Sequence, residues 1–201
     1  ARDSSGSSRG HATGVRPVRG FRGALSGVAL GLAIGLVTPL TLAAQSAPPN
    51  FLTEFGGQFG ASASKIEALA AAMPMSVYSW SPGEGVTSVV SVYMHIARYN
   101  YMYLHENLGQ ESPVSPAEYR RWEEEVTDKD EALEILQAST AYVRSVTEEM
   151  SATDLEHEVP LYGRDVGEWA VLLQLVTHMN EHLGQSIAYA RMNGVVPPWS
   201  M

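Results

Sequence analysis

The chain has 201 residues, of which 45% are hydrophobic, and this composition indicates a globular protein with one ordinary domain rather than a disordered chain. It has 13 basic and 22 acidic side chains, a balance that argues against nucleic acid or an anionic membrane surface as a partner. The absence of cysteine excludes disulfides, thiolate nucleophiles and cysteine-ligated zinc sites.

The first 47 residues have the composition of an export signal rather than of a folded core. Residues 1–20 are rich in Ser, Gly and Arg without apolar periodicity, and we expect them to be disordered. Residues 23–44 are apolar and uncharged, follow three arginines and end in small residues, which predicts a secretory signal peptide cleaved near Ala43, Ala44 or Ala47. The alternative is an uncleaved membrane anchor, because the run approaches the roughly 20 residues that span a bilayer. Its glycines and Pro39 favour cleavage.

We therefore expect an exported protein, periplasmic or secreted, with a signal region over 1–47 and one domain over 48–201. Without residues 1–44 the chain keeps 8 basic and 21 acidic side chains, so this domain is distinctly acidic. We expect a small-molecule substrate and no nucleic acid. A membrane would be contacted only through an uncleaved signal segment, and a homodimer is left open.

The first half of the domain predicts two long amphipathic helices. The first covers 50–73, where apolar side chains recur on a spacing of about 3.6 residues. The turn that follows contains Tyr78 and Trp80, whose rings are expected to pack against the domain. The second helix covers 87–108, and Gly109 fits its C-terminal cap.

The second half predicts two further long helices. A connection with one short helix, capped by Ser115, leads to a third long helix that Asp128 caps and that runs to about residue 150. An extended segment follows, with a brief strand at "EHEVPL". The fourth helix covers 168–193 and stops at Gly194. The fold class predicted from these elements is all-α, a four-helix bundle in antiparallel or crossover order.

Histidines of the second and fourth helices form a candidate metal site. His178 and His182 are four residues apart, so they point from one helix face and can bind one ion. The alternative is a solvated polar face shared with Asn180 and Glu181. His95 lies in the apolar stretch "VYMHIA", where an unpaired imidazole would be costly to bury. It is either a third ligand or a core histidine bonded to a backbone carbonyl.

Three neutral imidazoles suit a divalent ion such as Zn, Ni or Fe, and they leave a coordination position open, as in catalytic rather than structural sites. The other histidines do not join this set. His105 lies about 15 Å along the helix from His95 and is expected on the surface. His157 is expected to be solvated, and His11 belongs to the signal region.

Three features occur together in this chain: Trp80 before a Pro/Gly turn, His95 in "VYMHIA", and the longer motif "HMNEHLGQSIAYARMNGVVPPWS". In these features the sequence resembles the DinB/YfiT-like superfamily of four-helix metalloproteins. It implies a metal ion held by His95, His178 and His182. It also implies a metal-dependent enzyme, since characterised relatives include transferases and isomerases that use bacillithiol or mycothiol. Most such relatives are intracellular, and the predicted export differs from them.

Two residues beside the histidines are candidates for catalysis. Glu181 could act as a base, although a solvated helix face is the alternative, and Tyr99 could donate a proton or orient a substrate instead of serving only for packing. Gly184 costs roughly 0.5–1 kcal/mol relative to Ala inside a helix, which predicts close helix packing there. Gln185 could instead cap or hydrogen-bond a neighbouring connection.

After the fourth helix, Arg191 and Trp199 are expected to anchor the segment "VVPPWS" against the bundle, with Trp199 lining the cleft.

Three hypotheses follow for the whole chain. It is an exported metal-dependent hydrolase or thiol or group transferase, a non-catalytic metal-binding or helical interaction module, or a purely structural bundle.

Overall fold

The structure is a computed structural model that describes residues 47–48 and 50–200. The predicted disordered segment and signal peptide, together with His11, lie outside the described residues. Within the described part, no helix is long and apolar enough to cross a membrane.

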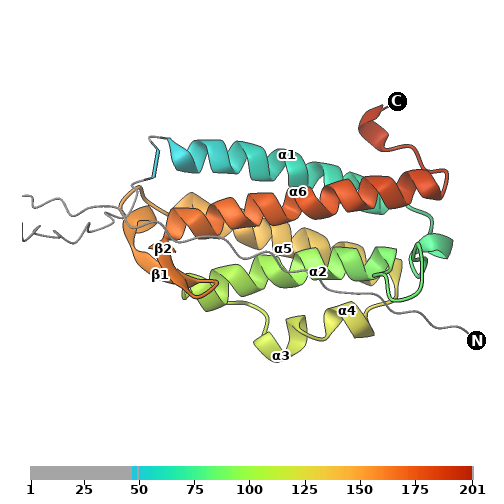
Figure 1. Ribbon diagram of the computed structural model, residues 1–201, viewed down its shortest axis with the longest axis horizontal. Helices are drawn as coiled ribbons and strands as arrows, with labels where there is room; N and C mark the ends of the chain where they lie inside the picture. The colour runs from blue at the N-terminus through green and yellow to red at the C-terminus, as the bar shows by residue number, and fades with distance from the viewer. Residues whose placement is uncertain (1–46, 49, 201) are drawn as a thin grey trace, which may run out of the picture. The chain divides into compact units, whose positions relative to one another are not determined.

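In the described part of the chain, four long helices lie side by side and enclose one hydrophobic core (Figure 1). They are α1 (Phe51–Ala72), α2 (Val89–Met102), α5 (Lys129–Glu149) and α6 (Glu168–Met192). Helix α1 contacts α5 and α6, and α2 contacts the same two helices. The core side chains include almost fully buried residues from every one of the four, among them Phe59, Ile66, Met94, Ile96, Leu136 and Leu175. The predicted long helices are confirmed, three of them to within about two residues at each end.

The second helix departs from the prediction at its C-terminal end. Helix α2 is α-helical to Met102 and continues as one π-helical turn, η2 (Tyr103–Asn107), in which the Leu108 amide donates to the Tyr103 carbonyl at 3.3 Å. Gly109 has a φ of 67°, a left-handed conformation that Gly adopts without steric cost, so the predicted cap is confirmed.

The connection between α1 and α2 packs onto the domain as predicted. It contains the short helix η1 (Met75–Val77), and the backbone carbonyls of Tyr78 and Trp80 accept hydrogen bonds from the first two amides of α2, at 2.9 and 3.0 Å. The buried Tyr78 hydroxyl donates to the Ala70 carbonyl at 2.8 Å, and the Trp80 ring meets the ring of Tyr189 edge-on.

The connection between α2 and α5 contains two short helices where one was predicted. They are α3 (Pro116–Tyr119), which Ser115 caps, and α4 (Trp122–Glu125). Helix α4 lies against α2, and its Trp122 is only 7% exposed because its ring packs edge-on against Tyr101 at a centroid distance of 5.6 Å. This contact fixes the position of the residues that follow Trp122.

Asp128 caps α5, as the sequence predicts, by accepting hydrogen bonds from the amides of Asp130 and Glu131 at 2.9 and 3.0 Å. We expect Asp128→Ala to lower the free energy of unfolding by about 0.5–2 kcal/mol, because two amides at the start of the helix lose their acceptor. Thermal denaturation would measure the change. Glu134→Ala, which removes an exposed carboxylate from the same helix, is the control. Equal losses in the two variants would contradict the capping role.

The segment before α6 forms a β-hairpin. The short helix η3 (Asp154–Glu156) precedes β1 (Glu158–Leu161), which pairs antiparallel with β2 (Arg164–Gly167). The strand expected at "EHEVPL" is confirmed, and β2 was not predicted. The turn residues Tyr162 and Gly163 both have positive φ, 52° and 77°, as a type I′ turn requires. Tyrosine is an uncommon residue there, so the turn lacks the usual sequence signal.

The C-terminal segment packs against the bundle. Gly194, with a φ of 73°, lets the amide of Val195 donate back to the Ala190 carbonyl at 2.8 Å, which ends α6 as expected. The short helix η4 (Pro198–Ser200) follows. Val195 packs on the core and Pro197 is buried, whereas the side chains of Arg191 and Trp199 are exposed. Val195 and Pro197, which were not predicted, pack against the bundle, and η4, which contains Trp199, contacts α1. The anchoring predicted for Arg191 and Trp199 stays a prediction.

Candidate metal site

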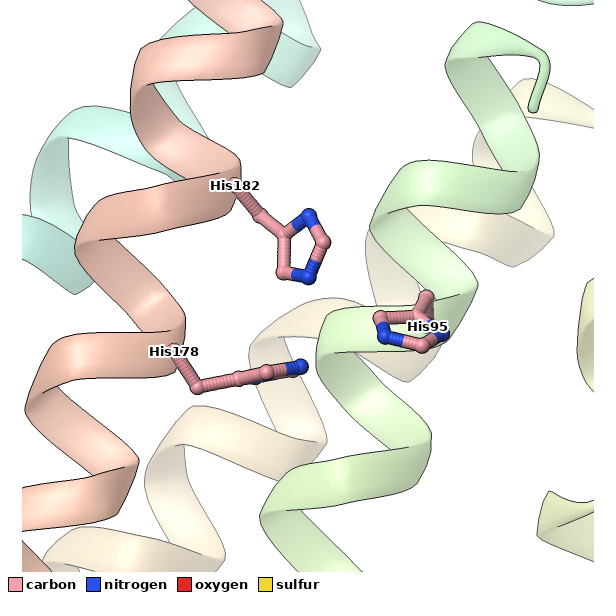
Figure 2. Close-up of side chains that lie close together, drawn as sticks. All are labelled: His95, His178 and His182. Carbon is pink, nitrogen blue, oxygen red and sulfur yellow. The ribbon is translucent and has the colours of Figure 1, made fainter. Parts of the chain in front are cut away.

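Helices α2 and α6 bring His95, His178 and His182 together. The ring centroids are separated by 5.1 Å between His95 and His178, 4.7 Å between His95 and His182, and 4.5 Å between His178 and His182. One ring nitrogen from each can be chosen so that all three lie within 4.8 Å of one another. Figure 2 shows one nitrogen of every ring pointing into the space between the two helices. The three residues singled out from the sequence thus share one location.

His178 is the most buried of the three histidines, with 7% of its surface exposed. Its Nε2 is inaccessible to solvent and has no hydrogen-bond partner among the described residues. Burial, reinforced by repulsion from His182 and His95, lowers the pKa of His178 from 6.5 to about 3. Burial is also the main cause that lowers the pKa of His182. Both imidazoles are therefore neutral near pH 7, the form in which a ring nitrogen can donate a lone pair to a metal ion.

The ring of His95 contacts a carboxylate that the sequence did not reveal as part of the site. His95 Nδ1 lies 3.1 Å from Oε1 of Glu123, in α4, and Nη1 of Arg98 donates to the same oxygen at 2.9 Å. Partial burial alone would raise the pKa of Glu123, but the hydrogen bonds and charges of His95 and Arg98 outweigh it and lower the pKa. A cavity of about 430 Å³ borders Arg98 and Glu123 on this side of α2, and the three histidines do not line it.

The ring of His182 is held by a side chain of its own helix. His182 Nδ1 lies 2.8 Å from Oε1 of Gln185, and Nε2 of Gln185 donates to the Tyr189 hydroxyl at 2.9 Å. Gln185 therefore contacts a candidate ligand instead of a neighbouring connection. The packing predicted for Gly184 is wrong, because nothing lies within 4 Å of where a Cβ would stand. Glu181 is exposed, in agreement with a solvated helix face.

Tyr99, one turn after His95, lies directly beside the site. Its ring centroid is 4.5 Å from that of His95 and 4.7 Å from that of His178, and the guanidinium of Arg98 lies 5.3 Å from the ring. Tyr103 continues this row of rings, at 5.4 Å from Tyr99 and 6.1 Å from His178. Tyr99 therefore packs directly against two of the three histidines, His95 and His178.

The other described histidines lie outside the site. His105 is half-buried, and its Nδ1 is 2.8 Å from the Gln110 carbonyl oxygen. His157 is exposed, as expected, with Nδ1 3.6 Å from a carboxylate oxygen of Glu168. Trp199 is not among the described contacts of the three clustered histidines, so its predicted place in a cleft has no support.

We expect the metal-free protein to lose stability as the pH falls from 7 to 5. The unfolded imidazole of residue 178 binds a proton near pH 6.5, whereas the folded one does so only near pH 3. The unfolded state therefore takes up more protons in this window, so the free energy of unfolding falls as the pH falls. The part of this pH dependence that comes from His178 is absent above pH 6.5. Urea denaturation with a chelator at several pH values measures the effect. His178→Leu should flatten the profile, and parallel profiles for the two proteins would contradict the expectation.

Comparisons with known proteins bear on the family and the fold of this chain. A family model described as the DinB superfamily matches residues 58–190. A search of curated proteins finds no match. A solved DinB-like protein from Bacillus cereus has a TM-score of 0.62 at 18% sequence identity, over 73% of this chain and 95% of that one. One from Bacillus subtilis has a TM-score of 0.56 at 19% identity, over 71% and 93%.

A mycothiol-dependent maleylpyruvate isomerase is also similar, with a TM-score of 0.53 and 20% identity over 66% of this chain and 59% of that one. At such identities the structural matches show a common fold and no more. The family model, in contrast, covers more than half of the chain and includes all three clustered histidines. The chain therefore belongs to the DinB superfamily.

Proposed function

We propose that this protein is an exported metal-dependent enzyme, a hydrolase or a thiol or group transferase. Its four long helices would form a four-helix bundle that holds one divalent ion, Zn, Ni or Fe, on His95, His178 and His182. The proposal that the protein is exported rests on the sequence of residues 1–47 alone. A small molecule is the proposed substrate.

The observation that carries the proposal is the buried Nε2 of His178. A buried nitrogen without a partner costs free energy in a folded protein, and here it points toward two further imidazoles. A purely structural bundle would gain stability from an apolar side chain at this position. An ion bound by the three rings would explain why a histidine is tolerated there.

Three protein ligands are the donor set of catalytic rather than structural zinc sites. When bound, such an ion supplies an open coordination position where an oxygen can be polarised or the pKa of a water lowered. The chain itself contributes the orientation of His95 through Glu123 and of His182 through Gln185. Tyr99 is close enough to the rings to orient a substrate or donate a proton to it, and the exposed Glu181 is the weaker candidate for a base.

The proposal that thiols participate draws on one similar protein. The isomerase among the similar structures is mycothiol-dependent, and this chain spans 59% of its length. We therefore include low-molecular-weight thiols among the cosubstrates to test, beside water.

Turnover by metal-loaded and metal-stripped protein tests the proposed function. We expect at least one member of a panel of esters, amides, phosphoesters and thiol-transfer substrates to be turned over, with loss on chelation and recovery on adding the metal back. His178→Ala should be inactive and His157→Ala, which removes an exposed histidine outside the site, should be active. Turnover by His178→Ala at the wild-type rate would refute the assignment. A protein that binds the ion and turns over nothing would instead be a metal-carrying module.

A further inference from the structure

Three side chains on one face of α2 contact Glu123. Ser91, His95 and Arg98 lie four and three residues apart, so they project from the same side of the helix. The Ser91 hydroxyl donates to the backbone carbonyl of Glu123 at 2.9 Å, while His95 and Arg98 contact its carboxylate. The side chains of His95, Arg98 and Glu123 are each about a quarter exposed, at 27%, 26% and 24%. Glu123 is thus held at three points, two contacts to its carboxylate and one to its backbone carbonyl.

The chemistry of Glu123 determines which nitrogen of His95 carries the proton. An ionised carboxylate accepts hydrogen bonds and donates none, so a ring nitrogen 3.1 Å away must be the protonated one. With the proton on Nδ1, the lone pair of neutral His95 is on Nε2. The contact between His182 and Gln185 does not determine which nitrogen of His182 is protonated, because the amide of Gln185 has both an acceptor and a donor end.

We propose that Glu123 is a positioning residue of the metal site, which fixes His95 as the Nδ1-protonated tautomer and presents its Nε2 to the ion. Arg98 is the residue that holds Glu123 in place. Its Nη1 bonds the carboxylate while its guanidinium lies over Tyr99, whose ring in turn packs against His95. The short helix α4, outside the four long helices, is therefore part of the site. The role toward the ion rests on the proposed function, whereas the tautomer of His95 does not.

Carboxylates that accept a hydrogen bond from a ligand histidine recur in metal sites, and their removal typically costs about 10–100-fold in metal affinity. We expect a loss of this size for zinc binding by Glu123→Ala, measured by competition with a chromophoric chelator. Glu123→Gln keeps an acceptor oxygen and should lose less, and Arg98→Ala should fall between Glu123→Ala and the wild type. Glu124→Ala removes an exposed carboxylate from the next position of α4 and should leave the affinity unchanged.

A second measurement needs no metal. Long-range ¹H–¹⁵N spectra of the metal-free protein, recorded above pH 7, report which nitrogen of each neutral imidazole is protonated. We expect His95 to be protonated at Nδ1 in the wild type and to shift toward the Nε2-protonated form in Glu123→Ala. An Nε2-protonated His95 in the wild type, or unchanged tautomer and zinc affinity in Glu123→Ala, would overturn the proposal. An Nδ1-protonated His95 that depends on Glu123, in a protein that binds no zinc, would support the tautomer assignment and contradict the proposed function.

Discussion

His178→Leu is expected to stabilise the metal-free protein by about 1 kcal/mol and, at the same time, to remove metal binding. A buried polar group without a hydrogen bond costs about 1–3 kcal/mol, and Nε2 of His178 is such a group. Leucine removes that cost, with some loss from its different shape. Because a proposed ligand is deleted, the fall in metal affinity should exceed the roughly 10–100-fold typical of losing a residue that hydrogen-bonds a ligand.

Urea denaturation in the presence of a chelator measures the first effect, and zinc titration measures the second. His105→Leu is the matched control, because His105 is a half-buried histidine of η2 whose ring does have a partner, the Gln110 carbonyl. Its replacement should destabilise the protein by about 1 kcal/mol, the net value of a typical hydrogen bond, and leave zinc binding intact. If both variants were destabilised alike, His178 would not be the uncompensated polar group that the structure indicates.

Trp122→Ala is expected to cost about 3–5 kcal/mol of unfolding free energy and also to weaken metal binding. The first effect follows from removing a large aromatic side chain that is 93% buried against Tyr101, which leaves a cavity beside α2. Metal binding should weaken because Trp122 attaches α4 to α2, and Glu123 is the residue directly after Trp122. Without this contact, Glu123 should no longer stay within hydrogen-bond distance of His95.

Phe59→Ala provides the comparison for this variant. Phe59 is 1% exposed, lies in α1 and stacks on Phe55 at a centroid distance of 5.5 Å, so its loss should cost a similar free energy. In the described structure, its ring contact is with Phe55, and it lies on a different helix from Arg98 and Glu123. Zinc affinity measured at a temperature where both variants are folded should fall only in Trp122→Ala. Equal affinities in the two variants would show that α4 does not position Glu123.

Much of the fold could be predicted because its signals are local. The periodicity of apolar residues located α1 and α6, and the capping residues Asp128 and Gly194 located ends of helices. The three histidines could also be found from sequence. The spacing of His178 and His182 places them on one face, and the apolar surroundings of His95 indicate that it faces the domain, where its ring meets that of His182.

The contacts that surround the histidines could not be predicted, because they join residues far apart in the chain. Glu123 is the first of three consecutive glutamates in a charged connection, a pattern that is usual for solvated surface. Glu123 differs from Glu124 and Glu125 because Trp122 packs on α2 and Glu123 contacts His95 and Arg98, which are long-range contacts. The hairpin was incomplete in the prediction for a different reason, since its turn places a tyrosine, Tyr162, in the left-handed conformation that Asn and Gly usually supply.

The π-helical turn η2 at the end of α2 has no distinctive sequence either. Tyr103, its first residue, belongs to an aromatic series that looks the same whether the helix continues regularly or widens by one residue. At Gly184 the sequence predicted a close helix contact that the structure does not have. A helical glycine commonly marks a close approach of backbones, yet the space around this one is open, and nothing in the structure explains its choice.

The most direct test of the account is the metal content of the wild type and of three single variants, His95→Ala, His178→Ala and His182→Ala. The proteins should be purified without a metal-affinity tag, equilibrated with zinc and analysed by mass spectrometry of the bound metal. We predict about one ion per chain in the wild type and a small fraction of this in each variant, because the three nitrogens surround one location. Full occupancy in all three variants, or no tightly bound ion in the wild type, would contradict a metal site at these histidines.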